Sequence, residues 1–237
     1  MMLKLQKEEP YPDVLALVKK LAVSNDPFLN DKPKGCIRCA VVGNSGNLKQ
    51  SGYGKIIDSH NLVIRMNQCP VNGFEKDVGS KTTHYIAYPQ SFRQEDLRNA
   101  SLVLAAFSAQ DMRWLRDGLA GKKDKNIKPV KVDRKKVFLF NPELMWHIKH
   151  QWGIGEGKWP STGIISAFFA LQICDEVNIF GFGANRMGYW DHYFENNDGK
   201  ANSEFQKTHV HDSDAESQLL KKFSDDGKIV FYRGART

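Results

Sequence analysis

The segment Gly43–Asn47 has the residue types and the spacing of a ligand-binding turn. Four apolar residues, Cys39–Val42, run directly into it, so we interpret them as a buried strand and the segment as the turn at its carboxyl end. Ligands of open α/β sheets bind at this edge, where loop amides point outward. Asn44, Ser45 and Asn47 add short donors and acceptors, and two glycines let the backbone approach a ligand. A plain strand-to-helix connection explains the same turn.

The segment Ser161-Thr162-Gly163 has the composition of a second binding element. It begins an apolar stretch, Gly163–Cys174, whose apolar residues recur three and four positions apart and predict a helix. The amide groups and the dipole at a helix N-terminus favour an anion. Ser161 also has the type of an N-cap residue, and the two roles are compatible.

The seven histidines are the candidates for proton transfer, because the unperturbed histidine pKa of about 6.5 lies close to working pH. His192 and His211 are each followed within five residues by a glutamate, Glu195 and Glu216, that could hold a nearby element by hydrogen bonding. An ordinary histidine is a satisfied or exposed side chain. We expect that ordinary role for His60, His147 and His150.

The elements that must position these residues follow from the apolar pattern. Seven short runs predict strands: Arg38–Val42, Leu62–Arg65, His84–Ala87, Leu102–Ala106, Val137–Phe140, Glu176–Phe180 and Lys228–Tyr232. Helical periodicity is clearest at Gly163–Cys174 and Ala215–Phe223. Strands that alternate with helices predict an α/β fold, a mostly parallel sheet with helices on both faces. The 237 residues suit a single domain, which we place at 35–237 after a partly ordered extension, 1–34.

Composition and charge restrict the class of protein. An apolar content of 41% with 11% aromatic residues argues for a folded globule rather than disorder. The net charge of +7 suits a basic cleft for an acidic ligand, although solubility explains such a value equally well. The basic segment Lys122–Lys136 contains Asp124 and Asp133 and accompanies no nucleic-acid-binding module, so we interpret it as a solvated loop and expect no nucleic-acid partner.

Four separated segments resemble the sialylmotifs of the eukaryotic sialyltransferases. The stretch from Cys39 to Thr83, with the turn described above and Arg65-Met66-Asn67, resembles the large motif. Pro160–Val177 resembles the small motif, and His192-Tyr193-Phe194-Glu195 resembles motif three. His211, with Glu216 five residues later, resembles the very small motif. The four occur in the family's order between residues 36 and 234.

Two further segments resemble one branch of that family, the β-galactoside α-2,3-sialyltransferases. They are Ile179–Ala184 and Lys207–Asp212. The resemblance implies transfer of sialic acid from CMP-sialic acid to the 3-OH of terminal galactose in Galβ1-3GalNAc, on glycoproteins or glycolipids. It also implies inversion at the anomeric carbon, no metal or other cofactor, a seven-stranded variant of the GT-A fold and a place in the Golgi.

The resemblance assigns the proton transfers to two histidines. It implies that His211 takes the proton from the galactose 3-OH and that His192 donates to the leaving phosphate. His209 is a competitor for the base, since it would face the same side as His211 in an extended segment. We keep His211 because the spacing of Asp212 and Glu216 fits the motif only from there.

The resemblance also implies which residues meet the two substrates. The expected donor-binding residues are Asn44, Ser45, Asn67, Ser161, Thr162, Gly163, Gly181 and Gly183. The last two glycines end a predicted strand, where backbone again comes near a ligand. Tyr88 and Trp159 are the expected acceptor-binding residues.

Three departures from the branch concern the acceptor side. Trp159 replaces a common tyrosine, Asp191 stands where the branch often has histidine, and a tyrosine expected near Asn126–Lys131 is missing. They bear on acceptor preference and efficiency more than on donor binding. The alternative hypothesis is therefore a catalytically inactive relative that binds CMP.

The triplet Asp212-Ser213-Asp214 matches the Asp-x-Asp pattern that binds manganese in many GT-A enzymes. A donor with a single phosphate offers no diphosphate for a metal to bridge. The triplet also directly precedes a predicted helix, so Ser213 or Asp214 is expected to be the N-cap. We favour capping over a metal site.

The four cysteines lack the paired short spacings of a zinc site. The resemblance implies that Cys39 pairs with Cys174 and ties the large motif to the small one. For Cys36 and Cys69, a bridge and two free thiols both fit the sequence.

The N-terminal region departs from the family's usual organisation. Family members are usually anchored in the Golgi by one N-terminal membrane helix, but the amphipathic stretch Val14–Leu21 is too short to span a bilayer and predicts a surface helix. We expect a fragment, an alternative form of a longer protein, or loss of the anchor. One sequon, Asn99-Ala100-Ser101, is consistent with a secretory route, although such triplets also arise by chance.

Overall fold

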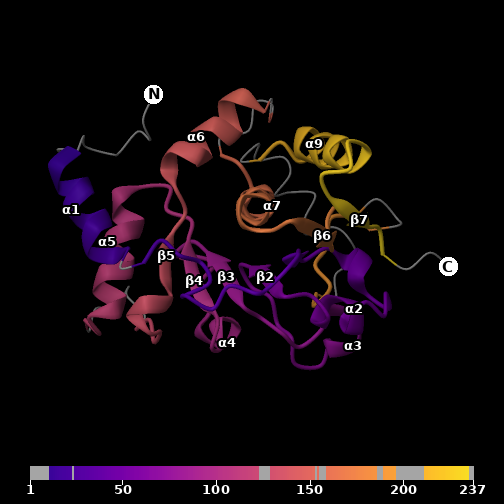
Figure 1. The fold of residues 1–237 in the computed structure, drawn as a ribbon, viewed down its shortest axis with the longest axis horizontal. Helices are drawn as coiled ribbons and strands as arrows, with labels where there is room; N and C mark the ends of the chain where they lie inside the picture. The colour runs from indigo at the N-terminus through magenta and orange to yellow at the C-terminus, as the bar shows by residue number, and fades with distance from the viewer. Residues whose placement is uncertain are drawn as a thin grey trace.

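A computed structural model describes most of the chain around one seven-stranded sheet (Figure 1). The described residues are 11–22, 24–122, 129–152, 154, 159–185, 189–195 and 211–234. The strands are β1 Arg38–Val42, β2 Leu62–Met66, β3 His84–Ala87, β4 Ser101–Leu104, β5 Val137–Leu139, β6 Glu176–Phe180 and β7 Val230–Tyr232. All seven predicted strands are therefore present, with small differences at their ends.

The strands are all parallel to their neighbours, in the order β5-β4-β3-β2-β1-β6-β7. The chain adds β2 to β5 on one side of β1 and then returns to place β6 on its other side. This reversal is the topological switch point at which α/β sheets bind ligands. The predicted α/β class and parallel sheet are confirmed, and the turns after β1 and β6 meet at the switch point.

Helices cover both faces and one edge of the sheet (Figure 1). They are α1 Tyr11–Leu21, α2 Gly54–Asp58, α3 Glu75–Val78, α4 Gln94–Leu97, α5 Ala109–Leu119, α6 Pro142–Gln151, α7 Thr162–Ile173 and α9 Ser213–Asp225, with 3₁₀ turns η1 Gly46–Leu48 and η2 Arg134–Lys136. Helices α6, α7 and α9 lie over one face, and α2, α3 and α4 lie under the other. Helices α1 and α5 lie beside the β5 edge of the sheet, where α1 packs on α5 and β5.

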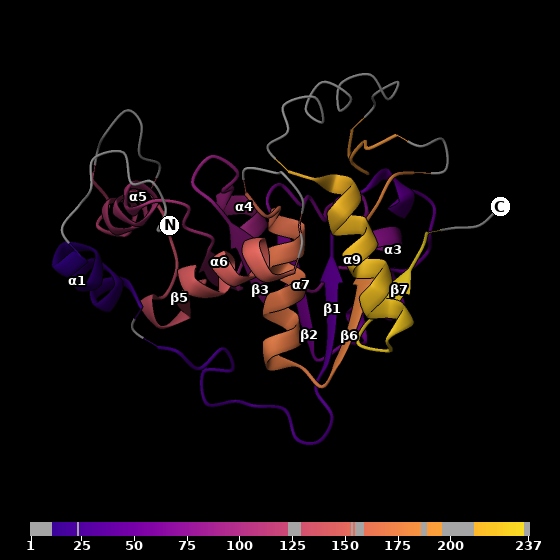
Figure 2. The ribbon, with the colours of Figure 1, turned by 90° about the horizontal axis from the view of Figure 1, so that it is seen from above.

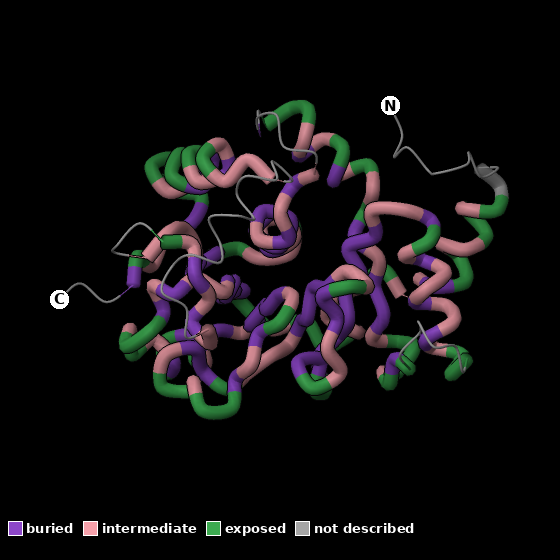
Figure 3. Tube along the Cα trace, turned by 180° about the vertical axis from the view of Figure 1, so that it is seen from behind, coloured by how far each residue is buried: buried purple, intermediate pink, exposed green. Residues whose placement is uncertain are grey.

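The core explains why the strands are apolar along their whole length. In β1, Val41 faces the cluster under α7, while Ala40 and Val42 face the cluster with α2 and α3. Both faces are buried, so apolar and polar residues do not alternate. Helix α7 packs against β1, β2, β3 and β6, and its Ile164, Ile165 and Phe168 are buried. Figures 2 and 3 show α7 over the centre of the sheet and the exposed outer faces of α6 and α9.

Strand β7 begins at Val230, two residues later than predicted, for a physical reason. The amides of Lys228 and Ile229 donate to the carbonyl of Phe223, at 2.8 Å and 3.3 Å, in the turn that follows α9. These donors are therefore used by the turn, and pairing with β6 begins at Val230. Helix α9 in turn is longer than the predicted Ala215–Phe223 at both ends.

Two of the four cysteines form a disulfide, and the other two are free thiols. Cys39 in β1 and Cys174, the residue that ends α7, form a disulfide, as the resemblance implied. Cys36 is an exposed free thiol and Cys69 a buried one, so the alternative of two free thiols holds. Burial raises the pKa of Cys69 to about 12.

The N-terminal segment is joined to the sheet by polar and apolar contacts. Leu21 of α1 is fully buried, and the His84 ring nitrogen Nε2 donates to the carbonyl oxygen of Pro27, 3.0 Å away. The other ring nitrogen of His84 lies 3.1 Å from the Thr83 hydroxyl. Among the described helices, none is both long and apolar enough to cross a lipid bilayer.

His84 makes the stability of the fold depend on pH. It is 3% exposed, and burial lowers its pKa to about 4. The unfolded chain binds this proton near pH 6.5, so the stabilisation is present above that pH and is lost as pH falls toward 4.

We predict that the unfolding free energy of the wild type falls more steeply between pH 7.5 and pH 5 than that of His84→Gln, by about 2 kcal/mol. Urea unfolding at both pH values, followed by circular dichroism, measures the difference. Equal slopes would show that the His84 ring contributes nothing to this pH dependence. His150→Gln, at an exposed position of α6, is the matched control and is expected to keep the wild-type slope.

Candidate active site

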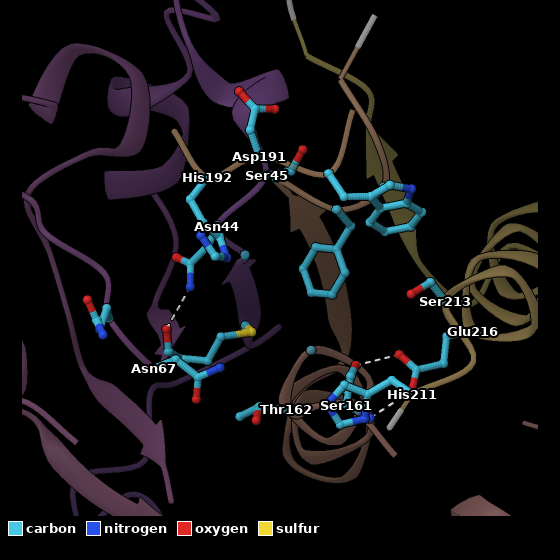
Figure 4. A pocket seen from close by; sticks show the side chains of 18 of the residues that line it. Asn44, Ser45, Asn67, Ser161, Thr162, Asp191, His192, His211, Ser213 and Glu216 are labelled. Carbon is cyan, nitrogen blue, oxygen red and sulfur yellow. Dashed lines mark hydrogen bonds between the residues drawn. The ribbon is translucent and has the colours of Figure 1, made fainter. Parts of the chain in front are cut away.

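A cavity of about 490 Å³ opens at the carboxyl ends of the strands, beside the switch point (Figure 4). All of the sequence-predicted donor-binding residues line it, and so do Tyr88, His192 and His211. Segments that lie more than a hundred positions apart thus meet around one space. Trp159 is not among the lining residues.

The turn after β1 is held against the turn after β6 by backbone contacts. The Gly43 amide donates to the Phe180 carbonyl at 2.8 Å, and the Ser45 amide donates to the Gly181 carbonyl at 3.0 Å. A Cβ on Gly43 would lie 2.4 Å from the Gly181 oxygen, so only glycine permits this approach. The Asn47 side chain donates to the Phe182 carbonyl at 2.7 Å and serves to join the two turns.

Two buried amide oxygens are available to a ligand. Nδ2 of Asn44 donates to the Met66 carbonyl at 3.1 Å, which leaves its Oδ1 without a hydrogen-bond partner among the described residues. Oδ1 of Asn67 is buried and unpartnered in the same sense, and Asn67 has a left-handed backbone with φ of 55°. Because an unpaired buried acceptor is costly, both atoms fit a bound molecule that donates hydrogen bonds.

The N-terminus of α7 is fixed by a buried carboxylate. The Ser161 amide donates to Oε1 of Glu216 at 2.7 Å, and the Ser161 hydroxyl donates to Oε2. Ser161 Oγ also accepts from the Ile164 amide at 3.2 Å, so it is the N-cap of α7, as predicted. Burial raises the pKa of Glu216 to about 7, against the opposing effect of the two hydrogen bonds from Ser161.

Capping also explains the Asp-x-Asp triplet, but through a different residue. The N-cap of α9 is Asp212, whose Oδ1 accepts from the Ala215 amide at 2.9 Å. The expectation of Ser213 or Asp214 is wrong because the helix begins at Ser213. Across the described ranges, no three histidine, cysteine, aspartate or glutamate side chains are grouped to hold a metal ion.

His211 is held as a neutral ring. Its Nδ1 donates to the backbone carbonyl of Trp159, 2.8 Å away, and a carbonyl can only accept. The neutral ring therefore carries its lone pair on Nε2. Burial lowers the pKa of His211, which keeps the ring neutral at pH 7. His209, the competing candidate, lies outside the described residues.

His192 is held on the opposite side of the cavity, next to Asn44 (Figure 4). Its Nδ1 lies 2.8 Å from Oε1 of Glu195, and its ring stacks on Phe194 with centroids 5.2 Å apart. A β-bridge joins His192 to Ser45. One histidine thus belongs to the β1 side of the cavity and the other, His211, to the α7 side.

The three histidines expected to have ordinary roles lie away from the proposed proton transfers. His60 is buried, with Nδ1 donating to the Ile56 carbonyl at 2.8 Å and Nε2 accepting from Asn178 Nδ2 at 2.7 Å. His147 and His150 lie on α6 and do not line the cavity.

An aromatic row leads away from the cavity. The rings of Tyr88 and Phe107 have centroids 6.0 Å apart, those of Phe107 and Trp159 5.6 Å, and Lys149 Nζ lies 5.7 Å from the Trp159 ring centroid. Trp159 thus reaches the site through its carbonyl contact with His211. Sequence reasoning missed Phe107, although it lies three residues after β4, at the edge of the sheet where ligands bind.

Comparison with known proteins identifies the family. The family model "Glycosyltransferase family 29 (sialyltransferase)" matches residues 2–228. The chain belongs to glycosyltransferase family 29. It is 45% identical over 94% of its length to CMP-N-acetylneuraminate-beta-galactosamide-alpha-2,3-sialyltransferase 2 of Mus musculus, and spans 64% of that relative. It is 41% identical over 98% of its length to CMP-N-acetylneuraminate-beta-galactosamide-alpha-2,3-sialyltransferase 1 of Homo sapiens, and spans 70% of that relative.

Solved sialyltransferase structures agree with the fold. A mammalian sialyltransferase matches with a TM-score of 0.82 and 40% identity, over 98% of this chain and 83% of that one. A mammalian sialyltransferase in complex with Gal-beta-1-3GalNAc-ortho-nitrophenol matches with a TM-score of 0.81 and 40% identity, over 98% and 84%. The resemblance stated from the motifs is confirmed at the level of the family and the fold.

We predict that Glu216→Ala lowers the unfolding free energy by about 2 kcal/mol, because the Ser161 amide and hydroxyl lose their buried acceptor. Urea unfolding at pH 7 measures the change. Glu143→Ala is the matched control, since the Glu143 side chain is 79% exposed on α6. A Glu216→Ala variant as stable as the wild type would show that the contact adds no net stability.

Proposed function

We propose that this protein is a β-galactoside α-2,3-sialyltransferase. It transfers sialic acid from CMP-sialic acid to the 3-OH of terminal galactose, with Galβ1-3GalNAc on glycoproteins or glycolipids as acceptor. The names of the curated relatives and the acceptor bound in the solved relative support this substrate pair. The observation that carries it is the His211 side chain that lines the cavity, with its Nδ1 held by the Trp159 carbonyl.

His211 is the general base of this proposal. The galactose 3-oxygen attacks the anomeric carbon of sialic acid as its proton passes to Nε2 of His211. The bond between that carbon and the phosphate oxygen breaks, and CMP leaves with the electron pair. A histidine that is neutral at working pH can accept this proton, and the hydrogen bond to Trp159 fixes the ring orientation.

His192 serves the leaving group from the opposite side. Oε1 of Glu195 lies 2.8 Å from its Nδ1 and orients the ring, and Nε2 is the proposed donor to the departing phosphate. The ring stacked on Phe194 has little freedom to turn away. The two histidines therefore act on opposite ends of one displacement.

The donor nucleotide is proposed to lie along the turns after β1, β2 and β6 and the start of α7. Asn44 and Asn67 present the buried acceptor oxygens described above, and these suit the hydroxyl and amino groups of a nucleoside. The N-terminus of α7 at Thr162 and Gly163 faces the same cavity and suits an anion. CMP-sialic acid has one phosphate and no diphosphate, so we expect the transfer to be metal-independent.

The compartment and the domain boundary are part of the same proposal. A disulfide that joins β1 to the end of α7 requires an oxidising environment, which the Golgi lumen provides. We propose residues 35–237 as the catalytic domain and residues 1–34 as part of a stem. The aromatic row Tyr88–Phe107–Trp159 is the proposed acceptor side.

The experiment that tests the function is transfer of labelled sialic acid from CMP-sialic acid to Galβ1-3GalNAc in the presence of EDTA. We expect an α-2,3-linked product and galactoside-dependent release of CMP. CMP binding without transfer would instead identify the inactive relative. Transfer that EDTA abolishes would contradict the metal-independent mechanism.

We predict that His211→Ala reduces transfer by at least about a hundredfold, because no other described group takes the proton in this mechanism. CMP affinity, measured by calorimetry, is expected to stay near the wild-type value. His150→Ala, on the exposed side of α6, is the matched control and should keep full activity. Turnover retained by His211→Ala would remove His211 from the mechanism.

A further inference from the structure

We infer that Lys49 and Asp191 form a polar clamp, completed by Asn185, that positions His192 for the leaving-group step. The motif resemblance gives no role to Lys49 or Asn185, and it connects Asp191 only with the acceptor side. The inference rests on the proposed function for its kinetic consequence. Its structural part rests only on the contacts around His192.

One ammonium group contacts the chain on both sides of His192. Lys49 Nζ lies 3.4 Å from Oδ2 of Asp191, the residue before the histidine. The same Nζ donates to the carbonyl oxygen of Glu195, three residues after the histidine, at 2.8 Å. Because Glu195 also holds Nδ1 of His192, Lys49 fixes the residue that orients the ring.

Asp191 is a buried carboxylate with defined partners. Its side chain is 7% exposed, and its Oδ1 accepts from Asn185 Nδ2 at 2.7 Å. Its backbone carbonyl accepts from the Gly46 amide at 2.7 Å. A Cβ on Gly46 would lie 2.4 Å from Oδ1, so the carboxylate packs directly on the turn after β1. A buried carboxylate needs a compensating partner, and Lys49 supplies the positive charge.

The clamp changes the interpretation of a departure from the branch. The sequence led us to assign Asp191, where the branch often has histidine, to the acceptor side. Its carboxylate instead contacts Lys49 and Asn185 and packs on Gly46, and Figure 4 shows it beside Ser45, on the far side of the cavity from His211. The contacts therefore connect Asp191 with the leaving group and with the donor turn.

The rate of transfer tests the clamp. Lys49→Met and Asp191→Asn are each expected to lower kcat about tenfold, since a small displacement of a catalytic group carries a cost of this order. The KM values for donor and acceptor should change by less than about twofold, as expected when a transition-state contact is lost. The double variant should be no slower than either single one, because both act through one contact. Asp191→Asn keeps an oxygen for Asn185 and so preserves that hydrogen bond.

The control is Lys221→Met, which removes an exposed lysine from an ion pair with Asp225 on α9 and should leave kcat unchanged. Additive losses in the double variant, or a raised KM with unchanged kcat, would overturn the clamp. So would unchanged kinetics in both single variants. A lowered melting temperature with normal kcat would reduce the pair to a structural role.

A second readout separates the clamp from the proposed function. In protein with ¹⁵N-labelled histidine, the His192 ring resonances should shift alike in Lys49→Met and Asp191→Asn and stay in place in Lys221→Met. Unmoved resonances would overturn the clamp even if the wild type transfers sialic acid. If the wild type shows no transfer but both variants show these shifts, the proposed function is wrong and the clamp stands.

Discussion

The parallel pairing of β1 with β6 is the constraint on which the site depends. The chain first adds β2 to β5 on one side of β1 and then places β6 on the other side, parallel to β1. This pairing brings Gly43 against Gly181, 138 positions later. Both positions need glycine, because a side chain on Gly43 would meet the Gly181 backbone and Gly181 has a left-handed backbone with φ of 70°. The turn that carries Asn44 and Ser45 and the bridge to His192 depend on this approach. At the opposite end of the same two strands, the disulfide between Cys39 and Cys174 joins the start of β1 to the residue that ends α7, just before β6.

The site consists of two separately anchored halves. His192 is attached to the turn after β1 by backbone bridging and by Glu195. His211 is attached to the start of α7 by the Trp159 carbonyl, next to the contact of Ser161 with Glu216. The separation of the two histidines is therefore set by how α7 packs on the sheet. An apolar helix packed over four strands provides a rigid spacing, because close-packed interiors deform little.

One physical effect serves both stability and chemistry in this molecule. His60, His84 and His211 all donate a ring N–H to a backbone carbonyl, and burial lowers the pKa of all three. For His60 and His84 the neutral ring joins elements within the fold. For His211 the same arrangement fixes the tautomer that a proton acceptor needs. Protonation in acid therefore opposes folding and the proposed base together.

The sequence by itself determined the class of the fold, the seven strands and the turns at the ends of β1 and β6, and the motif resemblance added the expected donor-binding positions. It could do so because buried parallel strands are apolar on both faces and because strand ends carry polar and glycine-rich turns, as at Val42–Asn47. Only the tertiary structure decided what individual side chains contact. Asp212 rather than its neighbours caps α9, Trp159 reaches His211 through its carbonyl, and Asp191 pairs with Lys49, 142 positions earlier. Such partners depend on how distant segments pack, which local patterns of polarity do not encode.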